Sequence, residues 1–365
     1  MSGKKVIISG GGTGGHIYPA IAIANALKKA HPDVEILFVG AKNRMEMQKV
    51  PLAGYKIVGL DIAGIQRSLS MQNLRFPFRL FKSLQEARNV VKDFAPNVCI
   101  GVGGYASGPT LFVAGRMGIP TLIQEQNSYA GITNKLLARK SKKICVAYPQ
   151  MDKFFSQDKI VFTGNPVRSD ILDISQKRLS ALHHFGLKEN KKTLLVIGGS
   201  LGARTINESI KKWMDRILDN DIQLIWQTGK TFYETAQKLV IDKRSEQIKV
   251  FDFINTMDLA YAASDVVISR AGALSISELC LVQKPCILVP SPNVAEDHQT
   301  KNAQVLAQNN AALMVADRDA DAFLVGDAID LLNDEALQNT LKNNIKKFAK
   351  PNAADEIVQE IMKIW

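Results

Sequence analysis

The chain has 365 residues, 46% of them hydrophobic and 22% charged, which is the composition of a folded protein rather than a disordered one. This length predicts two domains, each with its own hydrophobic core. The net charge of +11 comes from the first half, because residues 1–165 carry 22 basic and 9 acidic side chains whereas residues 166–365 carry 24 and 26. A basic half is typical of a surface that meets a polyanion such as nucleic acid, anionic lipid or a pyrophosphate, although a solubility bias gives the same count.

The apolar residues and the cysteines exclude further classes. No run of about 18 apolar residues occurs, so no membrane-spanning helix is predicted. The first apolar run is too short for a signal peptide and is expected to form a strand. The four cysteines (Cys99, Cys145, Cys280 and Cys286) form no C-x-x-C pair, and three lie in apolar segments. We therefore expect buried thiols in a reduced, cytosolic protein.

In the first half, short apolar runs alternate with amphipathic stretches. The runs predict strands at residues 6–9, 34–39, 98–101, 121–124, 144–147 and 159–163. Helices are predicted at residues 19–30 and 80–94, where apolar residues recur at helical spacing. Strands that alternate with helices imply a parallel sheet covered on both faces.

The pattern restarts after the turn-like sequence Gly164-Asn165-Pro166. Strands are predicted at residues 193–197, 222–227, 248–251, 266–269 and 286–289, and a helix at 355–365. Because each half opens with a strand, a glycine-rich turn and a helix, we predict an α/β protein with two doubly wound, Rossmann-like domains. The predicted domains are residues 1–163 and 164–340, followed by a helical segment, 341–365, that packs back on the first domain.

The first glycine-rich turn has the chemistry of an anion site. Gly10, Gly12 and Gly15 match G-x-G-x-x-G between a strand and a helix, where backbone N–H groups and the helix dipole favour phosphate. A dinucleotide site would also need a carboxylate after the second strand, and none occurs before Glu46. Since Arg44 offers a partner for a 2′-phosphate, an NADP-linked oxidoreductase stays as an alternative.

The histidine that follows this turn has two possible roles. His16 comes directly after Gly15, just before the first predicted helix. An imidazole beside an anion site is placed to take a proton from a substrate hydroxyl. It could equally make a hydrogen bond at the start of the helix, and its position alone leaves both roles open.

Other loops are expected to gather around the same region. In an open α/β sheet, ligands bind at the carboxyl ends of the strands. Gly15, Gly104 and Asn127 should therefore share one rim of the first domain. Ser200, Ile254, Gly272 and the loop 290–299 should share the facing rim of the second, with the active site in the crevice between them.

One strand-to-helix segment of the second half suits a ribose phosphate. Residues 269–278 contain Gly272 and Glu278, and the helix N-terminus within them can face a phosphate. Glu278 can accept two hydrogen bonds from a vicinal diol such as ribose, or it can be an ordinary glutamate on a helix surface.

In combination, these segments resemble the MurG family of glycosyltransferases, which attach N-acetylglucosamine to a lipid-linked precursor of bacterial peptidoglycan. The matching segments occur in the family's order along nearly the whole chain. They are GGTGGHxxP at 11–19, GGY at 103–105, EQN at 125–127, GNPVR at 164–168, GGSxGAR at 198–204, RxGALxxxE at 270–278 and DHQ at 297–299.

The resemblance implies the GT-B fold, UDP-N-acetylglucosamine (UDP-GlcNAc) as donor and undecaprenyl-pyrophosphoryl-MurNAc-pentapeptide as acceptor. It implies an inverting transfer to the acceptor's 4-hydroxyl, with His16 as base or as a ligand of the acceptor diphosphate, and neither metal nor cofactor. The donor-binding residues it implies are Thr13, Gly14, Gly15, Asn127, Arg168, Ser200, Ile254, Ala273, Leu274, Ser275, Ile276, Ser277, Glu278 and Gln299. Gly12, Gly103, Gly104 and Tyr105 would form the acceptor-side loops.

A lipid-linked acceptor implies a membrane contact, and one segment is suited to it. Residues 74–82 interleave large apolar side chains with cations, and a basic stretch follows at 139–143. Leu74, Phe76 and Phe78 are predicted to insert into an anionic membrane surface, whereas Leu80 and Phe81 are expected to be partly core residues of the next helix. The resemblance thus implies a peripheral protein on the cytoplasmic face of the bacterial inner membrane, with roles in cell shape and cell division.

Two departures and several alternatives remain open at this stage. Leu201 replaces a frequent glutamine of the family, and Asn255-Thr256 replace frequent acidic residues. The alternatives are another UDP-sugar glycolipid transferase, a UDP-sugar 2-epimerase of similar fold and the NADP-linked oxidoreductase. A nucleic-acid partner is not expected, because no RNA- or DNA-reading motif is present.

Overall fold

A computed structural model describes residues 3–62, 76–199, 201–243 and 245–365, and these form two compact units. The first unit comprises residues 1–168 and 351–365, and the second comprises residues 169–350. The turn at 164–168 therefore folds with the first unit rather than the second. Residues 341–350 belong to the second unit, so only the last 15 residues of the predicted C-terminal segment return to the first.

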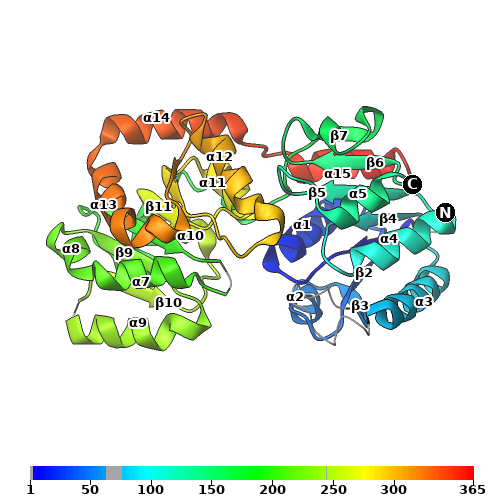
Figure 1. Cartoon of the computed structure of the whole chain (residues 1–365), viewed down its shortest axis with the longest axis horizontal. Coiled ribbons are helices and arrows are strands. Elements are labelled where there is room, and N and C mark those ends of the chain that lie inside the picture. Colours follow the sequence, from blue (N-terminus) through cyan, green and yellow to red (C-terminus); the bar gives the residue numbers. More distant parts are fainter. Residues whose placement is uncertain (1–2, 63–75, 200, 244) are drawn as a thin grey trace. The chain divides into compact units, whose positions relative to one another are not determined.

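The first unit is built on a parallel sheet of seven strands in the order β3-β2-β1-β4-β5-β6-β7 (Figure 1). Its strands are β1 (Lys5–Ser9), β2 (Glu35–Ala41), β3 (Lys56–Leu60), β4 (Val98–Gly101), β5 (Thr121–Glu125), β6 (Lys143–Val146) and β7 (Ile160–Phe162). The sequence analysis missed β3, whose residues are only partly buried until Leu60. β3 is one of the two edge strands of this sheet, and its partly exposed residues leave a weak apolar signal.

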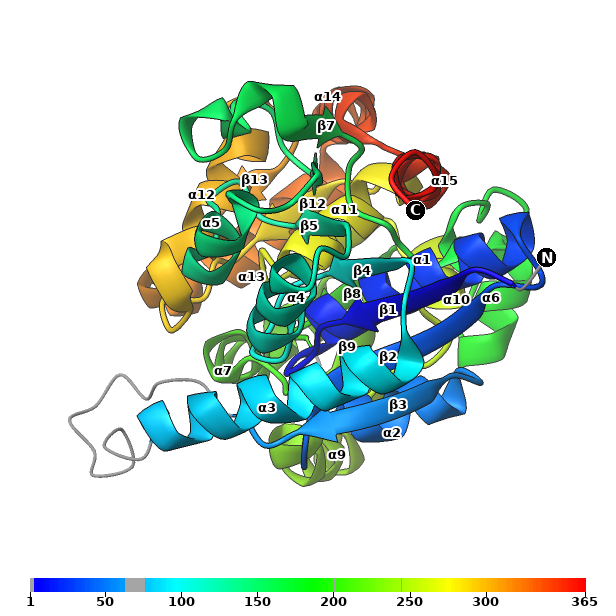
Figure 2. The same cartoon turned by 90° about the vertical axis from the view of Figure 1, so that its right-hand side faces the viewer.

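Helices cover both faces of this sheet. One face packs against α1 (Gly14–Ala30), α2 (Glu46–Leu52) and α15 (Ala353–Met362), which share a core with Val6 and Ile8 of β1. The other face packs against α3 (Phe76–Phe94), α4 (Ser107–Arg116) and α5 (Ile132–Ala138), which share a core with Ile7. Figure 2 shows α3, α4 and β1 with the neighbouring strands in this layered arrangement. The central strand is therefore apolar on both sides, as a doubly covered parallel strand requires.

The second unit has a parallel sheet of six strands in the order β10-β9-β8-β11-β12-β13 (Figure 1). Its strands are β8 (Thr193–Ile197), β9 (Gln223–Gln227), β10 (Ile248–Phe251), β11 (Val266–Ser269), β12 (Cys286–Leu288) and β13 (Leu313–Met314). Three of the predicted strands have the observed bounds, and the sequence analysis missed the two-residue edge strand β13.

Helices of the second unit supply its main apolar core and carry its loops. The core packs against α7 (Arg204–Lys212), α8 (Met214–Asp219), α9 (Lys230–Lys243), α13 (Ala320–Asn333) and α14 (Glu335–Ile345). The remaining helices are α6 (Arg178–Phe185), α10 (Met257–Ala263), α11 (Ala273–Val282) and α12 (His298–Ala307). Each sheet thus presents its glycine-rich loops at the carboxyl ends of its strands, the edge at which open α/β sheets bind ligands.

The three helices predicted with bounds all begin earlier than expected, although α15 does so by only two residues, at Ala353 rather than at residue 355. α1 starts at Gly14 rather than at residue 19, and α3 starts at Phe76 rather than at residue 80. Glycine and proline near a helix start weaken the periodic signal, although proline is well tolerated in the first turn. In the described part of the chain, no helix combines the length and the apolar character needed to cross a membrane.

Candidate active site

The first glycine loop joins β1 to α1 and depends on unusual backbone angles. Gly11 and Gly12 have φ values of +151° and +89°, which other residues rarely adopt. Thr13 precedes the helix without a side-chain cap, and the first turn of α1 holds no acidic residue. The backbone N–H groups in the first turn of α1 therefore form an electropositive helix start without a side-chain cap. Such a helix start suits an anion.

One amide of this loop is already bound to a carboxylate. Glu46, the first residue of α2, is fully buried, and its Oε2 accepts a hydrogen bond from the N–H of Gly12 at 2.8 Å. Its Oε1 accepts one from Ala41 at 3.0 Å. Gly12, which we predicted on the acceptor side, therefore has its N–H engaged within the protein. A carboxylate inside the loop also counts against the dinucleotide alternative, because it occupies an amide that a phosphate would need.

His16 is held by the carbonyl of the same loop. Its Nδ1 lies 3.1 Å from the carbonyl oxygen of Gly11 and 3.3 Å from the hydroxyl of Thr13. Because a carbonyl only accepts, Nδ1 carries the hydrogen, and the lone pair of the neutral ring is then on Nε2. The imidazole is thus oriented to accept a proton at Nε2. Its backbone N–H also bonds Thr13 at 3.1 Å, so the residue serves the helix start as well.

The second glycine loop packs directly against the first. Gly103 and Gly104 have φ values of +92° and +86°. The N–H of Gly11 donates to the carbonyl of Gly103 at 3.3 Å, and a Cβ on Gly104 would lie 2.2 Å from the carbonyl oxygen of Gly11. Tyr105 follows, with 49% of its side chain exposed. The structure therefore brings His16 and both glycine loops together at one edge of the sheet.

A buried carboxylate shapes the loop that carries Asn127. Glu125 accepts hydrogen bonds from the N–H groups of Asn127 and Gly131, both at 3.1 Å, and from the side chain of Asn134 at 2.8 Å. Burial raises the pKa of Glu125, and these hydrogen bonds oppose that shift. The side chain of Gln126 donates to Val102 at 3.0 Å, which ties this loop to the end of β4.

Arg168, predicted to touch the nucleotide, lies in the first unit. Its guanidinium stands 5.2 Å above the ring of Tyr18 on α1, in a cation–π contact. This contact orients the cation near the helix that follows the first glycine loop.

In the second unit, a glutamine joins two predicted donor-binding segments. Gln227 at the end of β9 donates to the carbonyl of Gly199 at 3.1 Å and accepts from the N–H of Ile254 at 2.9 Å. The backbone N–H of Ile254, a predicted donor-binding residue, therefore has a partner within the protein, and its side chain is buried. Ser200 lies outside the described residues, and its neighbour Leu201 is 80% exposed.

The start of α11 combines free amides with a buried carboxylate. Gly272 precedes the helix without a side-chain cap, and no acidic residue lies in its first turn. Of the predicted residues here, Ala273 and Ile276 are buried, whereas Leu274, Ser275 and Ser277 are partly exposed. Glu278 is only 5% exposed and accepts a hydrogen bond from the hydroxyl of Tyr261 at 3.0 Å, so it is not a helix-surface residue.

Two further contacts organise the loops around α11 and α12. Gln299 accepts from the N–H of Ser291 at 2.9 Å, which leaves its amide NH₂ as a donor. Arg270 forms an ion pair with Asp317 and donates to the carbonyl of Val289 at 3.1 Å. Arg270 therefore braces the strand ends. The ion pair engages the carboxylate of Asp317 in the Asp317-Arg318-Asp319 sequence. No group of three or more potential metal ligands occurs among the described residues.

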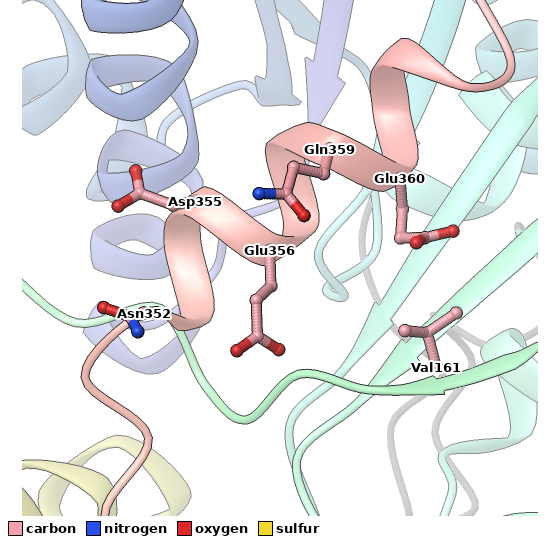
Figure 3. A pocket seen from close by; sticks show the side chains of 6 residues that line it. All are labelled: Val161, Asn352, Asp355, Glu356, Gln359 and Glu360. Atoms are coloured by element: carbon pink, nitrogen blue, oxygen red, sulfur yellow. The ribbon is translucent and has the colours of Figure 1, made fainter.

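A pocket of about 590 Å³ lies elsewhere in the first unit, between α15 and β7 (Figure 3). It is lined by Val161, Asn352, Asp355, Glu356, Gln359 and Glu360. Figure 3 shows Glu360 extending toward Val161 and Asp355 extending from another side of the helix. Three carboxylates repel a diphosphate, and none of the predicted site residues lines this pocket, so it is not the substrate site.

The predicted membrane segment is partly described. Leu74 lies outside the described residues, and Phe76 begins α3. Phe78 is 79% exposed, as predicted for a membrane contact. Phe81 is 72% exposed, so its predicted core position is wrong, whereas Leu80 is partly buried. Spaced three residues apart, Phe78 and Phe81 lie on the same side of the helix.

Sequence reasoning missed Glu46, Gln227 and Tyr261. Each has a hydrogen-bond partner 17 to 34 residues away in sequence, so only the fold shows that partner. For Glu46, one signal was available, since it is the first carboxylate after β2. We had considered that carboxylate only as a possible ribose ligand.

Family models match most of the chain. The glycosyltransferase family 28 N-terminal domain matches residues 6–146, and the glycosyltransferase family 28 C-terminal domain matches residues 193–360. The two matches fall in the first and second halves that the sequence pattern separates.

Relatives and a solved structure match the whole chain. A UDP-N-acetylglucosamine–N-acetylmuramyl-(pentapeptide) pyrophosphoryl-undecaprenol N-acetylglucosamine transferase from Parabacteroides distasonis is 58% identical, over 100% of this chain and 99% of the relative. The transferase of the same name from Cytophaga hutchinsonii is 57% identical, over 99% and 96%. The crystal structure of MurG from Acinetobacter baumannii is 29% identical, covers 99% of both chains and gives a TM-score of 0.78. The chain therefore belongs to the MurG family of N-acetylglucosamine transferases, which have the GT-B fold.

Proposed function

We propose that this enzyme transfers N-acetylglucosamine from UDP-GlcNAc to the 4-hydroxyl of MurNAc in undecaprenyl-pyrophosphoryl-MurNAc-pentapeptide, with inversion at the anomeric carbon. The names of relatives at 57% and 58% identity support the donor, the acceptor and the class of hexosyltransferase. The orientation of His16 by Gly11 carries the mechanism, because a hydrogen on Nδ1 puts the lone pair of the neutral ring on Nε2, the nitrogen that then accepts a proton.

We propose that the second unit binds most of the donor, and that Thr13, Gly14, Gly15, Asn127 and Arg168 of the first unit contact its transferred sugar and diphosphate. The diphosphate lies at the start of α11, where the amides near Ala273 and Ser275 and the helix dipole favour negative charge. Glu278 accepts hydrogen bonds from the ribose diol, and Tyr261 fixes its carboxylate. Gln299 keeps its NH₂ group available for a hydroxyl of the transferred sugar.

The first unit activates the acceptor. As the 4-hydroxyl oxygen attacks the anomeric carbon, its proton passes to Nε2 of His16, and the bond between the sugar and the β-phosphate breaks to release UDP. Since Nδ1 bonds the carbonyl of Gly11, the imidazolium that forms keeps that hydrogen bond. As a ligand of the acceptor diphosphate, His16 would instead need to be positively charged before the reaction begins.

The backbone stabilises the leaving group without a metal ion in this proposal. Charge builds up on the β-phosphate of UDP as the sugar departs. Preorganised amides and a helix N-terminus can stabilise such charge directly, because they need no reorganisation when it forms. The uncapped start of α11 supplies these groups.

We further propose that the layer of α3, α4 and α5 in the first unit meets the anionic membrane that holds the acceptor. Phe78 and Phe81 on α3 are 79% and 72% exposed, and Ile132 and Leu136 on α5 are 66% and 75% exposed. Cations accompany them, because Arg79 and Lys82 are exposed on α3, and Arg139 and Lys140 follow α5. Apolar side chains among cations suit an anionic lipid surface.

We also propose that the enzyme is a peripheral protein on the cytoplasmic face of the inner membrane. The four cysteines are free and buried. Burial raises the pKa of the thiols of Cys145 and Cys286 to about 12, which keeps them protonated and unreactive. Such thiols are compatible with a reducing compartment, and the product would supply cell-wall synthesis during growth and division.

One assay tests the proposed function. Release of UDP from UDP-GlcNAc is measured with and without a lipid-pyrophosphoryl-MurNAc acceptor, with UDP-glucose as a second donor. We expect release that depends on the acceptor and prefers UDP-GlcNAc, together with a β-1,4-linked disaccharide product. Turnover without acceptor, or a preference for UDP-glucose, would contradict the proposal.

A further inference from the structure

Glu46 is a fully buried carboxylate at the junction of two backbone segments. It is the first residue of α2, with 0% of its surface exposed. One oxygen accepts the N–H of Gly12 at 2.8 Å, and the other accepts the N–H of Ala41 at 3.0 Å. A single side chain therefore connects the end of β2 to the first glycine loop, 34 residues earlier in the chain.

The backbone around Glu46 is shaped to fit this carboxylate. A Cβ on Gly11 would lie 2.3 Å from Cδ and from Oε1 of Glu46, and a Cβ on Gly40 would lie 2.6 Å from its Cγ. Both distances are far shorter than any tolerated contact, so these two positions need glycine to admit the side chain. Part of the glycine-rich sequence thus serves an internal carboxylate rather than a ligand.

The glycine that precedes Gly12 also holds His16. Gly11 is adjacent to Gly12 in the chain, and its carbonyl oxygen lies 3.1 Å from Nδ1 of His16. The N–H of Gly11 donates to Gly103 at 3.3 Å. A shift of the peptide between Gly11 and Gly12 would therefore move the group that orients the imidazole.

We infer that Glu46 is a positioning residue for the transfer reaction: its carboxylate fixes the peptide of Gly11 and Gly12 so that the Gly11 carbonyl holds His16 with Nε2 toward the acceptor hydroxyl. This inference rests on the proposed role of His16 as base. It also implies that the acceptor diphosphate uses amides beyond Gly12, because that N–H is bound by the carboxylate.

The substitution Glu46→Gln tests the inference because it keeps the shape of the side chain. A glutamine oxygen can still accept one N–H, but its NH₂ group faces the other donor and cannot accept. We expect kcat to fall by about 10- to 100-fold, because a small displacement of a catalytic group has an effect of that size. The KM for UDP-GlcNAc should change much less than kcat, since the second unit binds most of the donor.

Glu86→Gln is the matched control. Glu86 lies on α3 of the same unit, and its carboxylate also accepts a backbone N–H, that of Asp61 at 2.7 Å, beside a strand end. It has no contact with either glycine loop among its hydrogen bonds. We expect this variant to change kcat by less than about threefold, as for substitutions away from a site.

A double-mutant cycle separates positioning from a merely structural role. The full-length enzyme is assayed with UDP-GlcNAc and a short-chain lipid-pyrophosphoryl-MurNAc acceptor, and UDP titration counts the folded donor sites. If Glu46 acts through His16, then Glu46→Gln should lower kcat per donor site in the wild type but not further in His16→Ala. Equal fold-losses in both backgrounds, or an unchanged kcat in Glu46→Gln, would overturn the inference.

Failure of the inference and failure of the proposed function give different results. A near-normal kcat in His16→Ala alone rejects the base role, and with it the reason for positioning. An impaired His16→Ala combined with a multiplicative effect of Glu46→Gln rejects only the inference. If Glu46→Gln does not fold, Glu46→Asp replaces it in the cycle. It keeps the charge but is one methylene too short to reach both Gly12 and Ala41, and the same outcomes decide.

Discussion

The backbone of Gly103 lies against the imidazole of His16. A Cβ on Gly103 would stand 2.6 Å from Cδ2 and 2.7 Å from Nε2 of the ring. The second glycine loop is therefore shaped around the nitrogen that we propose as the proton acceptor. Any side chain at this position must displace either the loop or the ring.

This contact predicts that two glycine substitutions differ in their effect on kcat. Gly103 and Gly118 have φ values of +92° and +78°, but a Cβ on Gly118 would meet nothing within 4 Å. Gly118→Ala should cost about 1–2 kcal/mol of the free energy of unfolding, because alanine is strained at this backbone angle, and Gly103→Ala should cost more, because its Cβ also clashes with the ring of His16. Only Gly103→Ala should also lower kcat, by about tenfold or more, because it moves a catalytic group.

Urea unfolding and steady-state kinetics check this pair. Activity that is lost in a folded Gly103→Ala but kept in Gly118→Ala supports the proposed site. An equal kcat in the two variants would show that the space beside His16 does not matter for the reaction.

His16→Ala should remove general-base catalysis. We expect kcat to fall by about 10²- to 10⁴-fold, the usual contribution of a positioned acid or base, with little change in the KM for UDP-GlcNAc. His31→Ala is the control, because His31 is a histidine of the same unit whose ring packs 5.0 Å from that of Trp365. Steady-state kinetics with both substrates checks the pair, and a rise in the KM for the acceptor with an unchanged kcat would favour the role of diphosphate ligand.

Most strands were predictable, because a strand that is buried on both faces of the sheet consists almost entirely of apolar residues. β4, β8, β10 and β11 have the predicted bounds, and all are interior strands except β10. The edge strands β3 and β13 were missed, since a partly exposed or very short strand leaves little pattern. The starts of α1 and α3 were predicted too late, because glycine and proline near a helix start weaken the periodic apolar pattern.

The side chains that brace the site could not be predicted in the same way. His16 directly follows a glycine-rich turn and Glu278 lies on the helix that follows Gly272, so the sequence indicates both as candidates although it leaves their roles open. Glu46, Gln227 and Tyr261 act on backbone groups or side chains elsewhere in the fold, and nothing near them in the sequence marks the partner. The sequence likewise could not show that the N–H groups of Gly12 and Ile254, both predicted site residues, have acceptors within the protein.

The hydroxyl of Tyr261 should matter for ribose binding. It donates to Oε2 of Glu278 at 3.0 Å in a buried site, so Tyr261→Phe removes one hydrogen bond without changing the ring. We expect the KM for UDP-GlcNAc to rise by about tenfold, as for the loss of a hydrogen bond to a charged group, with kcat nearly unchanged. Tyr55→Phe is the control, because its hydroxyl donates to Asn25 at 2.7 Å in the first unit.

Comparison with a 2′-deoxyuridine donor makes this test specific. The wild type should prefer the ribose donor strongly, because the deoxy donor leaves a buried carboxylate without its partner. Tyr261→Phe should weaken that preference while Tyr55→Phe keeps it. An unchanged preference in Tyr261→Phe would contradict the role of Glu278 as diol ligand.

Removal of divalent cations should leave the reaction intact. In our proposal, the amides and dipole at the start of α11 stabilise the leaving UDP, so activity should persist within about twofold in excess EDTA. Assays with and without EDTA, followed by added Mg²⁺, check this. A loss of activity that Mg²⁺ restores would show that the ion carries the charge of the diphosphate.

Membrane affinity should depend on Phe78 and Phe81 rather than on exposed apolar residues in general. Replacing either by serine should weaken binding to vesicles with anionic lipid by about tenfold. The reason is that the favourable transfer of the phenyl group from water into the lipid is then lost. Leu52→Ser is the control, because Leu52 is 81% exposed but lies on α2, on the other face of the same sheet. Sedimentation with vesicles at low and high salt measures the affinity, and turnover of a short-chain acceptor should stay normal in all three variants. Equal losses in Phe78→Ser and Leu52→Ser, or binding that is insensitive to salt, would contradict an anionic membrane surface at α3, because charge attraction between exposed groups is screened by salt.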